Sequence, residues 1–269
     1  MKFSASVIVS TYNSPEFLRQ VLHGYLTQTR FPNELIIADD GSTGETAALV
    51  KEFAETAPFR VRHVWQEDQG FRAAKVRNEA AKVSSTNYLI FTDGDCIPHP
   101  RFIEDHLHIA EPGWFVQGKR MLLSRDVSRT FSYPGLIGLI TLCLRGKVSG
   151  RHHLLRIPGC TIQKKGLRGI KTCNLALFRS DYFAVNGFNE DFIGWGREDA
   201  ELASRLFNYG LRRKDPLFLA LVFHLWHPEN SREKLVQNDK MLAASVRVGN
   251  FYCANGLVKD SAGPGERNA

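Results

Sequence analysis

The chain has 269 residues, of which 43% are hydrophobic and 23% charged. This composition excludes a disordered or fibrous protein and describes a globular chain long enough to bury a sizeable core. The formal net charge of +7 suggests an anionic ligand, a nucleic acid or an acidic membrane surface, and a basic solubilising surface explains it equally well.

The five cysteines form no CxxC pair and are odd in number, which argues against a disulfide framework or a zinc site and favours a reducing compartment. The first six residues contain no apolar region of the kind found in signal peptides. The longest apolar stretch, residues 131–144, is too short to span a bilayer. We therefore expect a cytoplasmic protein.

The first half of the chain alternates strand and helix patterns. Short apolar runs predict strands at residues 7–9, 35–38, 61–65 and 88–91, and amphipathic spacing predicts helices at 17–26, 47–54 and 73–83. Ser14 and Pro15 are expected at the start of the first helix. Strands and helices that alternate in this way indicate an α/β fold with a mostly parallel central sheet covered by helices.

The second half is less regular. Residues 124–171 combine a basic segment with the apolar stretch. Beyond them we expect strands at 173–178 and 217–223, helices at 197–209 and 231–246, and a flexible tail at 259–269. No linker is rich enough in proline or serine to indicate independent domains.

Polar residues follow three of the predicted strands: Thr11-Tyr12-Asn13, Asp39-Asp40 and Asp93-Gly94-Asp95. Ligands of open α/β sheets bind at the carboxyl ends of the strands, so these clusters are expected on one rim. Two carboxylates flanking a glycine suit a hard divalent cation. A simple turn is the alternative for this motif, and its position directly after a buried run favours the metal.

Other residues near this rim could bind a nucleotide. Asp40 could accept a hydrogen bond from the base or ribose, or cap the following helix. Tyr12 could stack on the base or pack against the protein. Arg72, Lys75 and Arg77 could neutralise a pyrophosphate, and a solvated basic helix face is nearly as good an explanation for each.

The segment 192–202 places Trp195 between two glycines, followed by Glu198 and Asp199 at the start of a helix. The indole could lie against a sugar ring. The helix dipole favours ionised carboxylates, and an ionised carboxylate aimed at a hydroxyl is a general base. Ordinary helix capping, with Trp195 in the core, explains the acids but not the flanking glycines.

His224 and His227 follow the last expected strand. A neutral imidazole could complete a metal shell begun by Asp95. Histidines at such positions are commonly structural, so His227 is favoured only modestly as a ligand and His224 less.

Together these motifs resemble those of family 2 glycosyltransferases of the GT-A fold. Residues 7–13, 39–43, 74–78 and 93–95 look like the donor-site motifs, and residues 187–199 are similar to the acceptor-side motif of galactosyl- and N-acetylgalactosaminyltransferases. Bacterial chondroitin-polymerase-like modules and animal β-1,4-galactosyltransferases carry related versions. The resemblance covers roughly residues 4–230.

The resemblance implies a role for each matching position. Asp95 and His227 would bind Mn²⁺ or Mg²⁺, and His224 stands where the animal enzymes have a methionine ligand. Asp199 would be the catalytic base, while Glu198 and Trp195 would contact the acceptor. The implied donor-binding residues are Thr11, Tyr12, Asn13, Asp40 (at uracil), Lys75, Arg77 and Asp93 (at the ribose or metal waters).

The implied activity is inverting transfer of a hexose or N-acetylhexosamine from a UDP-sugar to a glycan or lipid-linked glycan, in bacterial-type surface polysaccharide synthesis. Galactose and N-acetylgalactosamine are favoured, with glucose next. The implied organisation is one domain, residues 1–258, with a nucleotide-sugar-binding half (1–123), the insert (124–171) and an acceptor and catalytic half (172–258).

Two other classes fit less well. A sugar-nucleotide nucleotidyltransferase normally carries a glycine-rich basic loop after the first strand, which residues 10–13 do not provide. In a non-catalytic nucleic-acid-binding module the carboxylates would repel the polyanion, so we expect no nucleic-acid partner.

A further hypothesis concerns the apolar stretch 131–144 and the neighbouring Arg145, Lys147 and Arg151. This segment could associate peripherally with the anionic inner face of the cytoplasmic membrane, near a lipid-linked acceptor. Burial of the stretch in the core is an equally good alternative.

Overall fold

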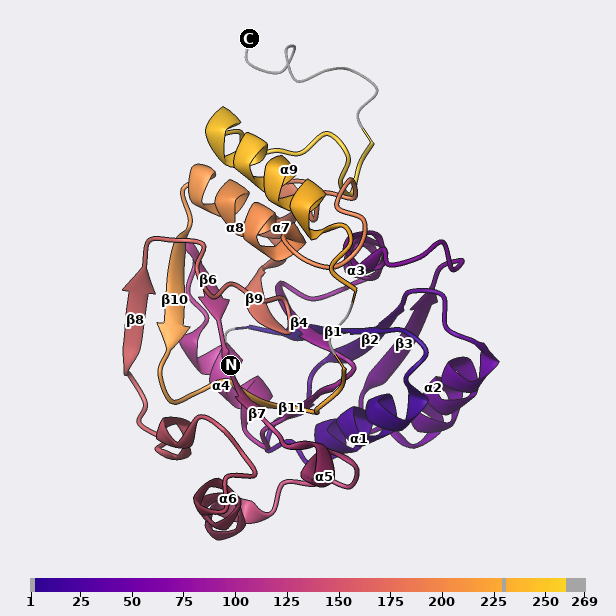
Figure 1. Ribbon diagram of the computed structural model, residues 1–269, viewed down its shortest axis with the longest axis vertical. Helices are drawn as coiled ribbons and strands as arrows, with labels where there is room; N and C mark the ends of the chain where they lie inside the picture. The colour runs from indigo at the N-terminus through magenta and orange to yellow at the C-terminus, as the bar shows by residue number, and fades with distance from the viewer. Residues whose placement is uncertain (1–2, 229–230, 260–269) are drawn as a thin grey trace.

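The computed structural model describes residues 3–228 and 231–259. Its centre is an eight-stranded sheet with helices on both faces, as Figure 1 shows. The strand order is β3-β2-β1-β4-β9-β6-β10-β8. The predicted α/β class is confirmed.

The first four strands are parallel and occupy one side of the sheet. They are β1 (Ala5–Thr11), β2 (Glu34–Asp39), β3 (Arg60–Trp65) and β4 (Tyr88–Asp93), which confirms all four predicted strands. The helices between them are α1 (Pro15–Leu26), α2 (Gly44–Thr56) and α3 (Ala73–Lys82). Successive side chains point to opposite faces of a strand. Val7 and Val9 therefore join the core that contains residues of α1 and α2, while Ile8 joins the core under α3.

The second half of the chain extends the same sheet. Strand β9 (Asn174–Phe178) runs antiparallel between β4 and β6 (Trp114–Gln117), and β10 (Arg212–Pro216) and β8 (Thr161–Lys164) complete the far edge. A second sheet of three strands contains β5 (Cys96–Pro98), β11 (Leu221–His224) and β7 (Lys119–Leu122). Strands of both halves are thus joined by hydrogen bonds.

The strand expected at 217–223 is confirmed only at its end. Residues 217–220 connect β10 in the large sheet to β11, which lies in the small sheet and covers Leu221–His224. Pro216 cannot donate a ladder hydrogen bond, and Ala220 has a φ of 53° in the left-handed region. Both features end the first strand and turn the chain into the second sheet.

The remaining helices are short apart from the last two. They are α4 (Phe102–Ile109), α5 (Arg125–Ser128), α6 (Gly135–Leu144), a 3₁₀ turn (Arg151–Leu154), α7 (Arg179–Ala184), α8 (Glu198–Asn208) and α9 (Leu235–Val248). Helix α8 confirms the expected helix, and α9 begins four residues later than the expected residue 231. Apart from Lys259, the expected flexible tail lies outside the described residues.

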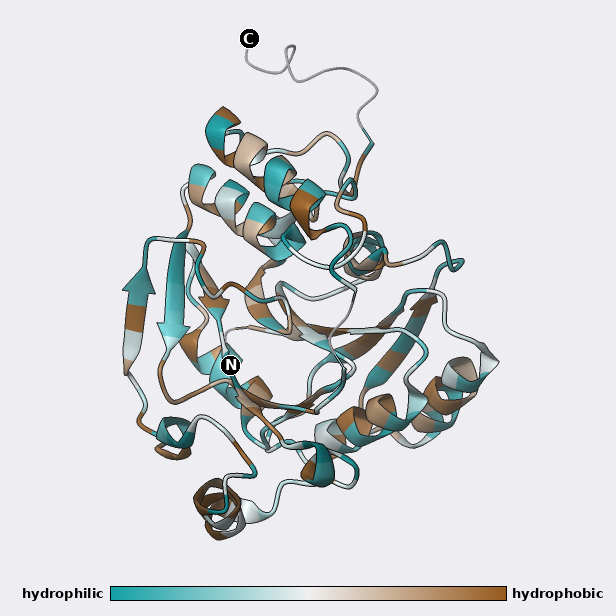
Figure 2. Cartoon of the chain, in the orientation of Figure 1, coloured by the Kyte–Doolittle hydropathy of each residue, from teal (hydrophilic) through white to brown (hydrophobic). Residues whose placement is uncertain are grey.

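Helix α6 is the strongly apolar helix at the bottom of Figures 1 and 2, away from the central sheet. Within it only Leu139 is buried, whereas Ile137 and Leu144 are 82% and 84% exposed. Core burial therefore does not explain most of this stretch. No helix among residues 3–228 and 231–259 is both long and apolar enough to cross a membrane.

Candidate active site

A cleft of about 1070 Å³ opens at the carboxyl ends of β1 and β4 and continues to the N-terminus of α8. It brings together most of the predicted residues from both halves of the chain. These are Thr11, Tyr12, Asp40, Arg77, Asp93, Asp95, Trp195, Glu198, Asp199, His224 and His227. Asn13 and Lys75 are not among the residues that line it.

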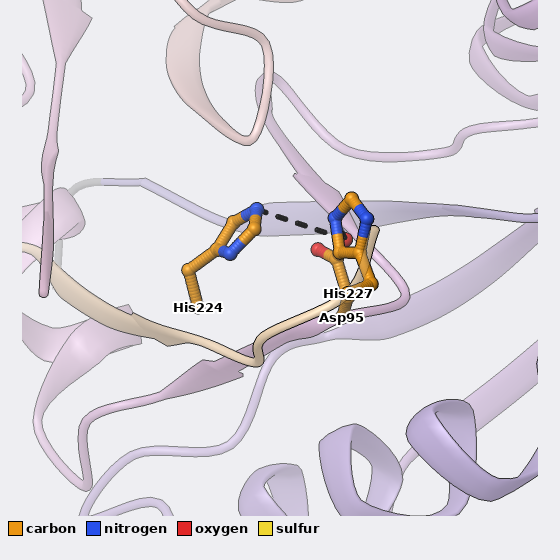
Figure 3. Close-up of side chains that lie close together, drawn as sticks. All are labelled: Asp95, His224 and His227. Carbon is orange, nitrogen blue, oxygen red and sulfur yellow. Dashed lines mark ion pairs between the residues drawn. The ribbon is translucent and has the colours of Figure 1, made fainter. Parts of the chain in front are cut away.

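Asp95, His224 and His227 form a compact cluster on one wall of this cleft (Figure 3). Oδ2 of Asp95 lies 3.0 Å from Nε2 of His227 and 3.7 Å from Nε2 of His224. One potential ligand atom from each residue lies within 4.8 Å of the others. Asp95 is 129 or more positions from the two histidines in the sequence, yet the three predicted metal residues are neighbours in the structure.

The chemistry of this cluster fits a divalent transition metal. Nδ1 of His227 lies 2.6 Å from the carbonyl oxygen of Pro228, which can only accept a hydrogen bond. The neutral imidazole therefore carries its proton on Nδ1 and leaves Nε2 free as a ligand. The hydrogen bond to Asp95 raises the pKa of His227 to about 9, so a metal would displace a proton there.

Two aspartates at the end of β2, Asp39 and Asp40, make different contacts. Asp39 is fully buried, accepts hydrogen bonds from His63 Nε2 (2.9 Å) and the Ser42 N–H (2.8 Å), and holds the loop after β2. Asp40 reaches the cleft and accepts from Gln66 Nε2 (2.5 Å) and from the backbone N–H of Arg72 (2.7 Å). Burial raises the pKa of Asp40. Arg72 thus contributes its backbone, not its charge, to this contact.

Tyr12 is 48% exposed, so it is not a core residue. Its hydroxyl donates to Asp68 Oδ2 (2.9 Å), which orients the ring at the cleft. Asn13 stabilises the loop instead of lining the cleft: its side-chain oxygen accepts from the Thr43 N–H (3.0 Å) and its own N–H donates to Ser42 (2.8 Å).

Arg77 is buried between carboxylates of the two halves. Its Nη2 lies 3.0 Å from Asp93 Oδ1, and its Nη1 lies 3.2 Å from Glu198 Oε1. Ser10 Oγ also contacts Asp93 (2.8 Å). Arg77 is therefore not an unpaired cation in the described structure, contrary to its expected use in neutralising a pyrophosphate. Oε2 of Glu198 is buried without a hydrogen-bond partner among the described residues.

Asp199 lies beside Glu198 at the start of α8. Burial, with the charge of Glu198, raises the pKa of Asp199 to about 7, and the charges of Arg77 and Lys171 act in the opposite direction. The helix dipole alone would favour the ionised form, and burial beside Glu198 opposes it. A base with a pKa near neutrality is well matched to proton transfer at that pH.

The loop before α8 presents Trp195 to the cleft. Gly194, Gly196 and Arg197 all have positive φ values, of 80°, 101° and 81°. This conformation is strained for arginine and accessible to glycine, which explains the glycines around the tryptophan. Asn238 Nδ2 donates to the carbonyl of Gly196 (2.9 Å) and fixes the loop. Trp195 is 37% exposed, so the alternative that placed it in the core is wrong.

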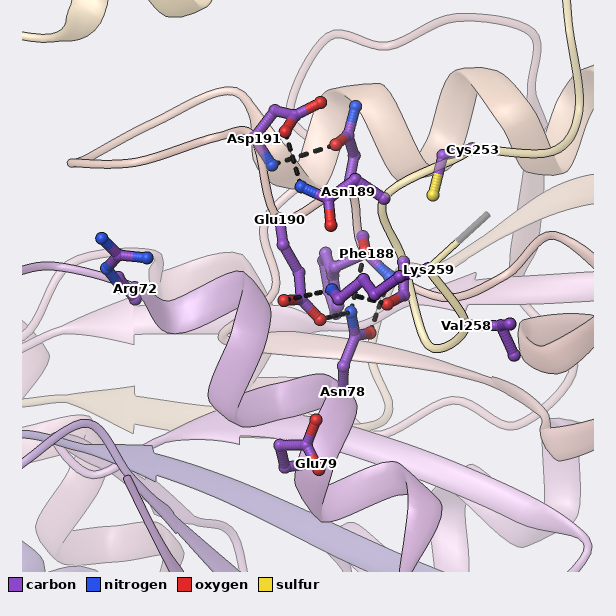
Figure 4. Close-up of polar contacts among 12 residues, drawn as sticks. Arg72, Asn78, Glu79, Phe188, Asn189, Glu190, Asp191, Cys253, Val258 and Lys259 are labelled. Carbon is purple, nitrogen blue, oxygen red and sulfur yellow. Dashed lines mark hydrogen bonds and ion pairs between the residues drawn. The ribbon is translucent and has the colours of Figure 1, made fainter. Parts of the chain in front are cut away.

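A side-chain network joins α3 to the segment that precedes this loop (Figure 4). Asn78 Nδ2 donates to Phe188 O and to Glu190 Oε1, both at 2.9 Å. Its Oδ1 accepts from the Phe188 N–H (2.9 Å) and from the Tyr182 hydroxyl (2.5 Å). Glu190 also pairs with Lys259. The neighbouring Arg77 and Asn78 therefore both connect the two halves of the chain.

Sequence reasoning missed several residues that line the cleft or contact residues that line it. Asp68 follows the third strand, the same position in the pattern that identified the other polar clusters, and it could have been found in that way. Arg120 and Trp226 line the cleft without any local motif. Lys171 was visible only as one cation of the basic segment 124–171.

Comparison of the sequence with models of known protein families identifies the family of the chain. The model described as glycosyl transferase family 2 matches residues 6–183, and a model described as the N-terminal domain of galactosyltransferase matches residues 152–228. The chain belongs to glycosyltransferase family 2. The nucleotidyltransferase and nucleic-acid-binding alternatives are thereby set aside, and the resemblance seen in the motifs is confirmed.

Curated relatives of this family 2 glycosyltransferase act on different substrates. A validoxylamine A glucosyltransferase of Streptomyces hygroscopicus subsp. limoneus is 29% identical over 77% of the chain and 48% of its own length. A chondroitin synthase of Escherichia coli is 24% identical over 76% of the chain and 32% of its length. The chain thus spans about half or less of these relatives.

Solved structures share the fold of this family 2 glycosyltransferase. Residues 1–349 of S. aureus TarS superpose with a TM-score of 0.62 at 17% identity, covering 90% of the chain and 65% of TarS 1–349. The same fragment in complex with UDP gives a TM-score of 0.61. These matches confirm the GT-A fold.

Proposed function

We propose that the chain is an inverting, metal-dependent glycosyltransferase that moves galactose or N-acetylgalactosamine from a UDP-sugar to a glycan or lipid-linked glycan. One observation carries the proposal: the Asp95–His224–His227 cluster and Asp199 line the same cleft. In transfer from a nucleoside diphosphate, a metal site stabilises the leaving diphosphate and a general base with a pKa near neutrality accepts the proton of the acceptor hydroxyl.

The reaction is a single displacement. Asp199 removes the proton from the acceptor hydroxyl while that oxygen attacks C1 of the donor sugar. The bond from C1 to the diphosphate oxygen breaks, UDP departs, and the configuration at C1 inverts. Glu198 contacts the acceptor, and Arg77 positions Glu198 and Asp93 through its two ion pairs.

Asp95, His224 and His227 would hold the metal. Bound there, a divalent cation stabilises the negative charge of the leaving diphosphate. Two imidazoles and one carboxylate suit Mn²⁺ better than Mg²⁺, because Mg²⁺ prefers oxygen ligands in octahedral geometry. We therefore favour Mn²⁺.

Tyr12 and Asp40 lie where the nucleoside would bind, on the side of the cleft that β1 and β2 form. Tyr12 would stack on uracil, and Asp40 would accept a hydrogen bond from it. The UDP complex of TarS has the same fold and supports UDP as the nucleotide. The match to the galactosyltransferase model supports galactose, whereas the validoxylamine relative is named for glucose transfer, so glucose remains the next candidate.

The cellular setting that we propose is surface polysaccharide synthesis at the inner face of the cytoplasmic membrane. The named activity of the chondroitin synthase relative supports polysaccharide synthesis. The exposed apolar side chains of α6, with Arg145 nearby, support peripheral contact with an anionic bilayer.

A UDP-release screen tests the function. The full chain is incubated with each of UDP-galactose, UDP-N-acetylgalactosamine and UDP-glucose, with Mn²⁺, with Mg²⁺ and with a chelator, against a panel of oligosaccharides. We expect Mn²⁺-dependent release that is greatest with a galactose-type donor. Absence of UDP binding and of release with every donor would overturn the proposal.

A further inference from the structure

A second cavity, of about 260 Å³, adjoins the active-site cleft. Arg120, Lys171 and Cys173 line both spaces, so they form the wall between them. Water occupies roughly 30 Å³ per molecule in the liquid, so this cavity has room for a charged group and part of a sugar ring.

The cavity is strongly cationic. Its charged lining consists of Lys119, Arg120, Lys164, Lys171 and Arg213 against the single carboxylate of Asp215, with His153 in addition. The cations come from β7, β8, β10 and the segment before β9, which are brought together only by the fold.

The single carboxylate of Asp215 cannot neutralise the five cationic side chains of the cavity. Both of its oxygens are taken by the buried Arg213, at 2.6 and 3.0 Å. Lys119 and Lys164 share the same carboxylate, at 2.8 and 3.2 Å. Lys171 has no carboxylate within ion-pair distance among the residues that the structure describes. A surplus of positive charge therefore remains, partly out of water, where an anion would be bound most strongly.

The position of the cavity indicates which substrate would occupy it. Lys171 lines both this cavity and the cleft that contains Asp199, the proposed base, so the cavity opens onto the cleft in which the acceptor hydroxyl must lie. The proposed nucleoside-binding residues Tyr12 and Asp40 line the cleft but not this cavity.

We propose that this cavity binds an oxyanion, a carboxylate or a phosphate, carried by the acceptor glycan on the sugar next to the one that is glycosylated. The proposal rests on the proposed function and specifies its acceptor as an acidic glycan. Lys164 and Lys119 bind the oxyanion, and Lys171 lies between it and the reacting hydroxyl.

The test is a binding experiment on the full chain, with UDP and Mn²⁺ present in excess so that the donor site is filled. Three disaccharides that share the sugar to be glycosylated are titrated by calorimetry: one whose neighbouring sugar is glucuronate, its carboxyl-reduced form, and one whose neighbouring sugar is a hexose 6-phosphate. Lys164→Gln removes a half-exposed cation of the cavity. Lys165→Gln is the matched control, because Lys165 is the next residue, is exposed and does not line the cavity.

We expect at least one acidic disaccharide to bind about tenfold more tightly than the neutral one, with the preference declining in high salt. Lys164→Gln should weaken acidic binding about fivefold, and Lys165→Gln should not. The relative strength of the two acidic probes distinguishes carboxylate from phosphate. Equal binding of neutral and acidic probes, no binding of any probe, or equal effects of the two substitutions would overturn the inference.

The two proposals fail in distinguishable ways. If UDP release and UDP binding are both absent, the proposed function is wrong. If UDP binds and neutral acceptors are glycosylated as well as acidic ones, the function stands and only the inference about the cavity is wrong.

Discussion

Nη1 of Arg77 lies 3.2 Å from Oε1 of Glu198, across 121 residues of sequence. Because Nη2 of the same guanidinium contacts Asp93, one buried cation links the carboxylate at the end of β4 to a carboxylate at the start of α8. Arg77 thus joins the proposed donor side of the cleft to the proposed acceptor side.

Removal of this cation should destabilise the fold. Arg77→Met leaves Asp93 and Glu198 as uncompensated carboxylates, and we expect the free energy of unfolding in urea to fall by about 3 kcal/mol. Arg19→Met is the control, because Arg19 and Glu52 form an exposed pair at 3.9 Å whose loss should cost under about 1 kcal/mol. Equal effects of the two substitutions would show that the Arg77 bridge is not structural.

Asp199→Asn should separate chemistry from donor binding. The amide cannot accept the acceptor proton, so we expect kcat to fall by at least ~100-fold while the Kd for UDP changes little. Single-turnover assays and calorimetry measure the two quantities. Asp191→Asn is the control, since Asp191 contacts Asn255 away from the cleft. Near-normal turnover of Asp199→Asn would assign the base to another group.

The rate should depend on pH through Asp199. The base acts only when it is deprotonated, and its pKa is raised to about 7, so activity should be lost as the pH falls through 7. Between pH 8 and pH 6 we expect a decrease of about tenfold in kcat. Glu198→Gln removes a charge that raises this pKa and should move the descending limb to lower pH. A kcat that is constant from pH 6 to pH 8 would contradict this assignment.

Metal removal should abolish transfer. Treatment with a chelator should eliminate UDP release, and Mn²⁺ should restore more activity than Mg²⁺ because of the two imidazoles. Asp95→Asn and His227→Gln should each weaken Mn²⁺ binding, measured by paramagnetic resonance, by at least ~10-fold. His23→Gln, at an exposed position on α1, serves as the control. Unchanged Mn²⁺ binding in both ligand variants would place the metal elsewhere.

Helix α6 should mediate membrane binding. The double variant Ile137→Glu and Leu144→Glu replaces two exposed apolar side chains with acids and should prevent co-sedimentation with anionic liposomes at low salt. The equivalent change at Val236 and Val248, exposed on α9, should have little effect. If the wild-type chain does not bind such liposomes, the membrane hypothesis is wrong.

The parallel half of the fold and its polar rim were predictable from sequence because local patterns determine them. Buried strands such as 35–38 appear as apolar runs, and ligand-binding residues follow the strand ends by a general rule of α/β sheets. Asp95 and Asp40 were identified in this way. The proposed metal ligands and base were suggested by the residues and given single roles by the family resemblance, and the structure brings these residues into one cleft.

Long-range pairing was not predictable. The apolar pattern over 217–223 is continuous, yet only residues 221–223 of it form a strand, which belongs to a different sheet from the preceding β10. The charge of Arg77 suggested an anion site, but which carboxylates it meets depends on the distant α8. Likewise, the cations of the second cavity lie on strands far apart in the sequence, and no local motif marks them.

The contacts that Arg77 and Asn78 make with the segment before and at the start of α8 have a consequence for re-engineering specificity. The proposed donor and acceptor segments look separable in the sequence, yet adjacent residues of α3 contact the proposed acceptor segment at Phe188, Glu190 and Glu198. A chimaera that imports another enzyme's acceptor segment would inherit its hydroxyl selectivity only if it kept partners for both Arg77 and Asn78. Contacts with helix α3 therefore limit which proposed acceptor segments can be exchanged between enzymes.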